Sequence, residues 1–227
     1  MNEKELAAIS LHELTQLTTY CLNVLSCTDE LRGNENLKDA YEQAKTLEGS
    51  IRKLKIASLM EKRTLICVSG MQGAGKTTMI KNFYGLKTEN LNICLGRGER
   101  IPVMITEKDI QEPLMQASVI ERGENGTYTV TDREMEPEEF AKASAGGDGS
   151  ILYLELCVPY RHLNNSGVSF VLLPGFEKKN DYWKTLIEFA VNSSDAAIFV
   201  FDESSFSQAD NYEQLRQLKD RFGENII

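Results

Sequence analysis

Apolar residues recur at three- and four-residue spacing along the first sixty residues, which is the period of an amphipathic helix. The segment contains no proline, and the stretch from Thr28 to Asn34 interrupts it with residues typical of helix ends. The apolar positions are Ala7, Leu11, Leu14, Cys21 and Leu25 before this break, and Leu37, Ala40, Ala44, Leu47, Ile51 and Leu54 after it. We therefore expect a helical hairpin over residues 1–60.

The apolar stripe of this hairpin needs a surface to pack on, and two interpretations remain open. The hairpin covers the domain that follows as a helical cap, or it pairs with a further helix as a coiled coil. The second stripe lasts about two and a half heptads, short of the roughly three to four that indicate a coiled coil. We therefore favour the cap.

The pattern changes at Thr64, where short apolar runs begin to alternate with helical segments. Strands are predicted at 64–69, 151–158, 168–173 and 196–201, helices at 79–84, 182–191 and 207–222, and the start of another strand at 226–227. A β-hairpin is predicted where 119–121 and 127–130 flank Asn125-Gly126. This alternation predicts an α/β sheet, and we assign 61–227 to one domain that follows 1–60.

The connections between these elements carry two further expectations. Only residues 159–167 separate the strands 151–158 and 168–173, too few for a parallel crossover. These two strands are therefore expected to be antiparallel neighbours. The acidic segment 132–139 and the glycine-rich segment 145–150 are expected to be solvated loops.

A complete phosphate-loop motif lies between the first strand and its helix. Gly70-Met71-Gln72-Gly73-Ala74-Gly75-Lys76-Thr77 matches G-x-x-x-x-G-K-[ST]. Glycines let successive backbone N–H groups point inward at phosphate oxygens, and the following helix adds its N-terminal dipole. We expect Lys76 to reach the β- and γ-phosphates of a nucleotide and the Thr77 hydroxyl to bind Mg²⁺.

Two elements compete for the second metal-binding position, and the loop itself does not separate ATP from GTP. The strand 196–201 ends in Asp202-Glu203, as in ATPases of the ABC and AAA type. Alternatively, Leu172-Leu173-Pro174-Gly175 stands where GTPases carry Asp-x-x-Gly.

The second interpretation gains from a resemblance to the dynamin superfamily that spans roughly residues 35–227. Residues 70–78 resemble its phosphate loop, G-x-Q-S-[AS]-G-K-S-S, and 151–156 with 168–175 resemble its strand pair ending in Asp-Leu-Pro-Gly. Residues 194–200 resemble its next strand, A-D-A-x-I-F-V, and 97–103 lie near its first switch, T-R-R-P.

This resemblance implies a bacterial dynamin-like GTPase with a Ras-like mixed sheet flanked by helices and preceded by neck helices. It implies GTP and Mg²⁺ at Gly70, Met71, Gln72, Gly73, Ala74, Gly75, Lys76, Thr77, Thr78 and Gly175. Gln72 and Lys76 would be catalytic, and the Gly175 N–H would contact the γ-phosphate. The family also implies a homodimer or higher assembly, a helical region downstream, and membrane remodelling through regions beyond this chain.

Three departures from the family pattern concern hydrolysis. Leu172 replaces the Asp that helps to hold Mg²⁺, Glu99 stands at the switch threonine with Thr106 as an alternative, and Gly73 replaces a serine. We therefore expect slow or assembly-dependent turnover, and a nucleotide-sensing module with little turnover stays open. The guanine-reading motif [NT]-K-x-D is absent, so we expect a fragment that stops before it.

Composition narrows the class of protein further. The chain has 227 residues, 41% of them apolar, and a formal charge of −9, which disfavours a nucleic-acid partner. No apolar run reaches the roughly 18–20 residues of a membrane span. The five cysteines form no C-x-x-C pair, so we expect no metal–thiolate site and a reducing, cytoplasmic location, with peripheral membrane contact as the resemblance implies.

Overall fold

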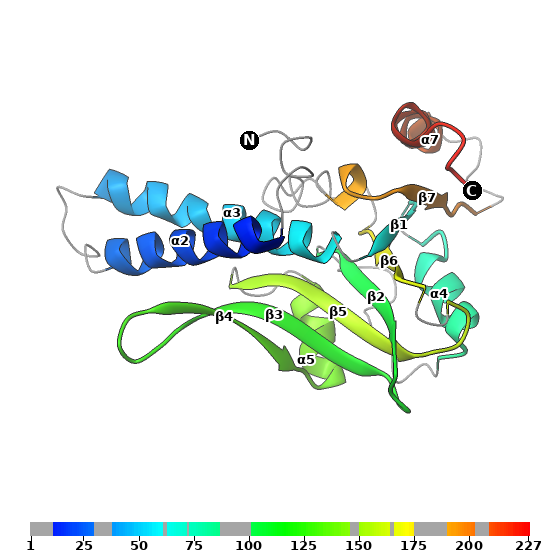
Figure 1. Cartoon of the computed structure of the whole chain (residues 1–227). Coiled ribbons are helices and arrows are strands. Elements are labelled where there is room, and N and C mark those ends of the chain that lie inside the picture. The colour runs from blue at the N-terminus through cyan, green and yellow to red at the C-terminus, as the bar shows by residue number, and fades with distance from the viewer. Residues whose placement is uncertain are drawn as a thin grey trace.

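A seven-stranded mixed sheet flanked by helices organises the chain (Figure 1). The computed structural model describes residues 11–29, 38–60, 63–71, 73–86, 101–145, 150–163, 166–174, 190–202 and 209–227. The strands are β1 (Thr64–Ser69), β2 (Val103–Lys108), β3 (Leu114–Arg122), β4 (Tyr128–Glu134), β5 (Ile151–Pro159), β6 (Val168–Leu172) and β7 (Ala196–Phe199). The helices are α2 (Leu11–Asp29), α3 (Lys38–Met60), α4 (Lys76–Tyr84), α5 (Pro137–Ser144) and α7 (Ala209–Phe222).

The order of the strands is β4-β3-β5-β2-β6-β1-β7. β1 lies between β6 and β7 and is parallel to both. β2 is antiparallel to β6 and parallel to β5, and β3 is antiparallel to β4 and β5. The carboxyl ends of β6, β1 and β7 therefore meet at one edge of the sheet.

The expectation that 151–158 and 168–173 are neighbours is wrong, although their antiparallel directions are confirmed. β2, which the sequence pattern did not reveal as a strand, lies between β5 and β6. The connection from β5 to β6 therefore crosses two strand spacings of about 4.8 Å each, which its residues span easily.

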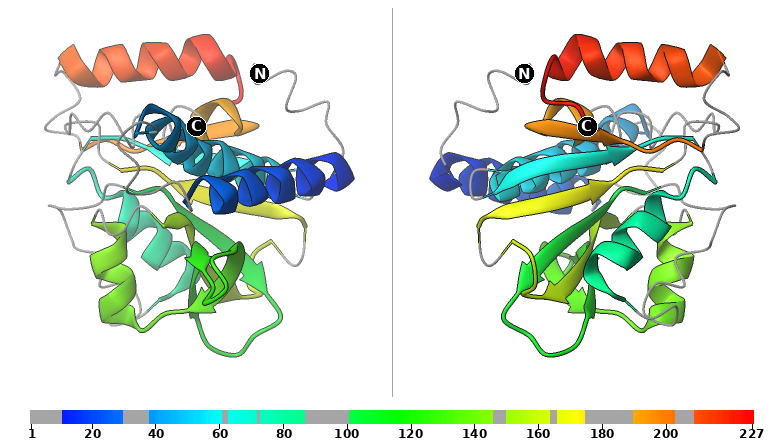
Figure 2. Two further views of the ribbon diagram at one scale, coloured as in Figure 1. Left: turned by 90° about the vertical axis from the view of Figure 1, so that its left-hand side faces the viewer. Right: turned by 90° about the vertical axis from the view of Figure 1, so that its right-hand side faces the viewer.

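Buried side chains line both faces of the sheet. On one face, Ile80 of α4 and Phe140 of α5 pack against strand residues that include Val68. On the other face, Leu218 and Phe222 of α7 pack against Leu65, Cys67 and Phe199. Figure 2 shows α7 on one side of the sheet and α4 with α5 on the opposite side. The apolar run Leu65–Val68 within 64–69 thus reflects burial from both sides, as predicted.

The two helices before β1 pack against each other and onto the sheet. Leu25 of α2 and Ile51 of α3 share a buried cluster with Ile120 of β3. The buried guanidinium of Arg52 donates hydrogen bonds to the carbonyl oxygens of Ile151 (2.7 Å) and Leu152 (3.1 Å) at the start of β5. The apolar stripes of this hairpin are thus covered in part by the sheet.

One predicted loop is regular structure. Residues 132–134 belong to β4, and Pro137–Ser144 form α5. Proline at the first turn and Glu138 and Glu139 after it favour a helix start, and Phe140 and Ala143 bury one face. The acidic residues around these apolar positions made the segment look like a solvated loop, so the sequence pattern did not reveal the helical spacing. Residues 146–149 of the other predicted loop lie outside the described residues.

The hairpin around Asn125-Gly126 and the helix near 207–222 are confirmed as β3–β4 and α7. Residues 225–227 also lie beside β7, because the Ala197 N–H donates to the Asn225 carbonyl and the Ile227 N–H donates to the Ala197 carbonyl, each at 2.9 Å. Of the helix predicted at 182–191, only residues 190–191 are described, and they are helical.

An ion-pair network around the buried Glu155 links Arg63, which directly precedes β1, to the middle of the sheet. Arg63 Nη1 lies 2.7 Å from Glu155 Oε1, and Lys108 Nζ lies 3.1 Å from Glu155 Oε2. Burial raises the pKa of the Glu155 carboxyl, but the hydrogen bond and charge of Arg63, together with Lys108, outweigh it and lower the pKa below its usual value.

This network predicts an acid-dependent stability. Because the pKa of Glu155 is lower in the folded chain, its contribution is present above about pH 4.3 and is lost as the pH falls through the folded pKa. Glu155→Gln should lose about 3 kcal/mol at pH 7, because Arg63 and Lys108 lose their partner, and should show a flatter acid limb. Urea unfolding between pH 7 and pH 3 measures both effects. The exposed Glu121→Gln is the control, and equal curves for the two variants would refute the assignment.

Candidate phosphate-binding site

The loop after β1 follows a path that glycine alone adopts without strain. Gly70 has φ +142°, and a Cβ there would lie 2.0 Å from the carbonyl oxygen of Val200. Gly73 (φ +83°) and Gly75 (φ +94°) also lie in the left-handed region. The Val200 N–H donates to the Ser69 carbonyl at 2.8 Å, so the residue after β7 is held directly against the start of the loop.

The N-terminus of α4 faces the loop and is open to an anion. α4 begins at Lys76, and its N-cap residue Gly75 has no side chain that could cap the first N–H groups. The first turn of a helix leaves N–H groups without intrahelical partners and carries a partial positive charge. Together with the glycine path, this gives the local geometry that binds phosphate oxygens.

The side chain of Lys76 folds back over the loop. Its Nζ donates to the carbonyl oxygens of Gly70 (2.8 Å) and Met71 (2.9 Å), and the residue is only 5% exposed. The Ala74 N–H also donates to the Met71 carbonyl, at 3.2 Å. The ammonium is thus held by the curled backbone of the loop.

α7 supports the loop from the other side of the sheet, a role that the sequence reasoning missed. Gln214 is buried, and its Nε2 lies 3.0 Å from the Sδ of Met71. Asn211, Gln214, Leu218 and Phe222 share one buried face of α7. Two amides within a helical stripe that is otherwise apolar are the signal that could have pointed to this contact.

Of the predicted phosphate loop, the structure describes residues 70–71 and 73–78. Thr77 is half-buried and Thr78 is exposed. Gln72 and Gly175 lie outside the described residues, as do Glu99 and Glu203. Thr106 is not near the loop. It lies in β2 opposite Ser169 at the other end of β6, where its hydroxyl accepts a hydrogen bond from Arg63 at 2.9 Å. Thr106 therefore does not stand in for a switch threonine here.

Leu172 ends β6 directly beside β1, at the same edge as the loop. Its neighbours across the strands are Val68 of β1 and Val103 of β2, and it is 2% exposed. It belongs to the apolar cluster that includes Ile80 of α4. A leucine in this environment supplies packing and no ligand for a metal ion.

The residues for a divalent cation are correspondingly few. Within the part of the chain that the structure describes, no three His, Cys, Asp or Glu side chains come together as a metal site. Asp202, past the end of β7, is exposed. Thr77 fits a magnesium site of the phosphate-loop type, in which most ligands are phosphate oxygens and water.

No described helix is long and apolar enough to cross a membrane.

No family model and no curated protein matches the chain. Two solved structures of an oligomerised bacterial dynamin pair, described as providing a mechanism for the long-range sensing and tethering of membranes, are similar to it with a TM-score of 0.44 each. The identities are 16% and 15%, over 80% and 79% of this chain and 33% and 32% of the solved chains. The chain thus spans about a third of the length of those proteins.

Gly70→Ala should destabilise the chain strongly. The new Cβ would overlap the Val200 carbonyl at 2.0 Å, so the backbone must shift, and we expect a loss of about 3 kcal/mol in the free energy of unfolding. Gly73→Ala is the matched control, because it has a positive φ but open space around the Cβ, and it should lose about 1 kcal/mol. Urea denaturation of both variants measures the difference. Equal losses would show that the close approach to β7 is not what requires glycine.

Leu172→Asp should also lose stability, because a carboxylate would enter the apolar cluster beneath α4. We expect a loss of about 3 kcal/mol or more, against less than about 1.5 kcal/mol for the volume-conserving Leu172→Met. Thermal and urea unfolding without nucleotide measure the two values. Wild-type stability in Leu172→Asp would mean that this side chain is not part of the core.

Proposed function

We propose that this chain is the nucleotide-binding head of a dynamin-like GTPase, which binds GTP with Mg²⁺ at residues 70–78. The observation that carries the proposal is the position of Lys76, whose ammonium lies inside a glycine-built loop between a buried strand and an uncapped helix. The sequence resemblance supplies the choice of GTP over ATP.

Each part of the loop has a role in this proposal. The backbone N–H groups at the start of α4 would hold phosphate oxygens, and Lys76 would exchange its two carbonyl partners for the β- and γ-phosphates. The Thr77 hydroxyl would hold Mg²⁺, which neutralises phosphate charge when it is bound. Gln72 and the N–H of Gly175 would act at the γ-phosphate, as the resemblance implies.

Hydrolysis is proposed to be slow or to require assembly of several copies. An aspartate beside the loop would orient Mg²⁺, and buried Leu172 cannot. The same observation favours a second candidate function, a nucleotide-sensing module that binds GTP with little turnover. Phosphate binding depends on the loop and not on residue 172, so it is expected both in a slow GTPase and in a nucleotide-sensing module.

The partners follow from the resemblance and belong to the same proposal. They are a second copy of the chain across the nucleotide face, a helical region downstream, and a membrane contacted through other regions. The alternative is an ATPase that uses Asp202 and Glu203, and its test is a preference for ATP.

Lys76→Ala should weaken GTP binding by roughly 30-fold or more, because a charge-assisted contact to the phosphates is lost. Titration calorimetry with GTP and with ATP, each with Mg²⁺ and with EDTA, measures this effect and the base preference. Lys81→Ala, further along the same helix, is the control and should bind normally. Thr77→Ala should reduce the gain in affinity that Mg²⁺ gives.

Three outcomes separate the candidate functions. Unchanged affinity in Lys76→Ala would refute the site, and a clear preference for ATP would refute the guanine assignment. Single-turnover hydrolysis, measured with dilute chain and with concentrated chain, distinguishes an assembly-dependent GTPase from a sensor that does not turn over.

A further inference from the structure

Met71 connects the phosphate loop to the helix layer beneath it. Its carbonyl oxygen lies inside the loop, where it accepts hydrogen bonds from Lys76 Nζ at 2.9 Å and from the Ala74 N–H at 3.2 Å. Its side chain is buried, and its Sδ lies 3.0 Å from the Nε2 of Gln214 on α7. A shift of Met71 therefore moves the carbonyl that receives both the ammonium of Lys76 and the turn at Ala74.

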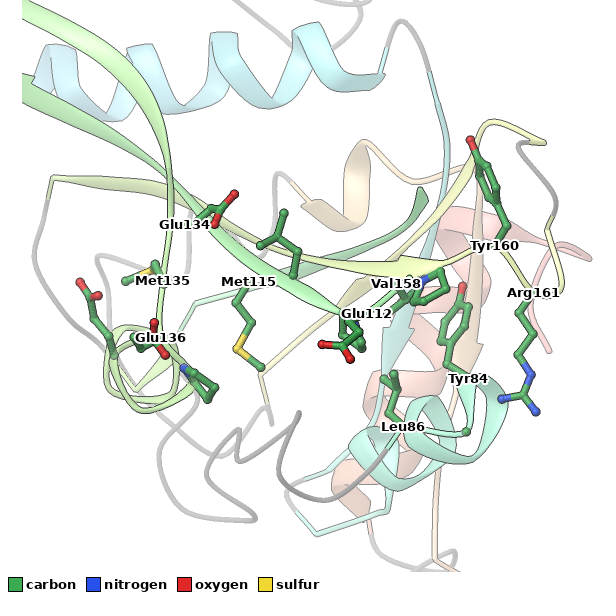
Figure 3. Close-up of a pocket in the computed structure, with 16 residues that line it drawn as sticks. Tyr84, Leu86, Glu112, Met115, Glu134, Met135, Glu136, Val158, Tyr160 and Arg161 are labelled. Atoms are coloured by element: carbon green, nitrogen blue, oxygen red, sulfur yellow. The ribbon is translucent and has the colours of Figure 1, made fainter. Parts of the chain in front are cut away.

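The opposite end of α4 does not reach the loop. It lies beside a pocket of about 700 Å³, whose lining includes Tyr84 and Leu86 but no described residue of 70–78 (Figure 3). α4 has nine residues and is therefore about 13 Å long, which separates this pocket from the loop. By contrast, α7 contacts the loop itself, at Met71.

Gln214 is a poor residue for packing at this position. It is 7% exposed, and the buried residues that follow it on the same face of α7, Leu218 and Phe222, belong to an apolar cluster. The thioether sulfur that it contacts is a weak hydrogen-bond acceptor. Within the part of the chain that the structure describes, the Oε1 of Gln214 has no hydrogen-bond partner. Because a buried amide oxygen without a donor is costly, an apolar side chain of similar volume would leave the chain at least as stable.

Ser69 is a second buried polar residue in the same layer. Side chains alternate along β1, so Ser69 faces α7 as Leu65 and Cys67 do. Its side chain is fully buried, and its hydroxyl has no hydrogen-bond partner among the described residues. Ser69 lies between Cys67, which belongs to the apolar cluster, and Met71, which contacts Gln214. The layer under α7 therefore changes from apolar to polar where it meets the loop, and packing stability does not explain that change.

We propose that Gln214 is a positioning residue for the phosphate loop, which it holds through Met71. This role rests on the proposed function, because the group that it positions is the ammonium of Lys76. The amide of Gln214 fixes the side chain of Met71, and thereby the carbonyl that receives Lys76 and the Ala74 N–H. Nucleotide then binds to a loop that is already ordered, which lowers the free-energy cost of binding.

Gln214→Met replaces the amide with an apolar side chain of similar length. A merely structural residue would lose stability and affinity together, so the two are measured separately. Without nucleotide, the variant should unfold at the wild-type temperature or up to about 3 °C higher. Its dissociation constant for GTP with Mg²⁺, from titration calorimetry, should rise about three- to ten-fold. Gln217→Met, at an exposed position of the same helix, is the matched control and should change that constant less than about two-fold.

A double-mutant cycle shows whether the effect passes through Met71. Met71→Leu conserves the volume, removes the sulfur acceptor, and should weaken GTP binding by a similar factor. If Gln214 acts through that sulfur, Gln214→Met combined with Met71→Leu should bind GTP no more weakly than either single variant. Losses that multiply in the double variant would overturn the role assigned to Gln214, because the two residues would then act independently.

Hydrogen exchange of the Ala74 amide reports on the loop without nucleotide. This N–H donates to the Met71 carbonyl, so Gln214→Met should speed its exchange about three- to ten-fold, whereas Gln217→Met should not. Wild-type exchange in Gln214→Met would overturn the positioning role, as would a lower unfolding temperature or unchanged GTP affinity in that variant. If the wild-type chain binds no nucleotide, the proposed function fails, and the exchange rate still decides whether Gln214 orders the loop.

Discussion

The buried ammonium of Lys76 is the interaction on which the arrangement of the loop depends. A charge in a buried position is costly unless hydrogen bonds satisfy it, and the carbonyl oxygens of Gly70 and Met71 do so here. Those carbonyls converge because Gly70 has a positive φ and approaches Val200 more closely than any side chain would allow. The position of the lysine, the glycine path and the place of β7 beside β1 therefore require one another.

Leu172 shows how the same neighbourhood balances packing against metal chemistry. It ends a strand with partners on both sides, in the apolar cluster that holds α4 on the sheet. An aspartate here would need water or a cation to offset its burial. Leu172 provides packing that holds α4 on the sheet, and it provides no carboxylate beside the loop. A phosphate-loop path without a carboxylate from the end of β6 beside it is the physical consequence.

The sequence predicted local elements better than their spatial order. The loop, the strands 64–69 and 151–158 and the hairpin at Asn125-Gly126 follow from short-range patterns and are present. The insertion of β2 between β5 and β6 could not be predicted, because pairing depends on contacts between residues about 50 positions apart in the chain. Likewise, α5 was not predicted because its acidic residues resemble a solvated loop. The Gln214–Met71 contact was not predicted because it joins residues from different layers of the fold.

The dipole of α4 is used at both ends of the helix. The partial positive charge at its first turn faces the glycine loop, where the N-cap Gly75 has no side chain to cap it. At the last turn Gly85 and Leu86 donate backbone hydrogen bonds to the carbonyls of Asn82 and Lys81. The guanidinium of Arg161 lies against Gly85, and the Nε2 of His162 lies against the Phe83 carbonyl, so side chains of the same chain meet the negative end. The fold therefore satisfies the C-terminal end of α4 internally and leaves the N-terminal end facing the loop.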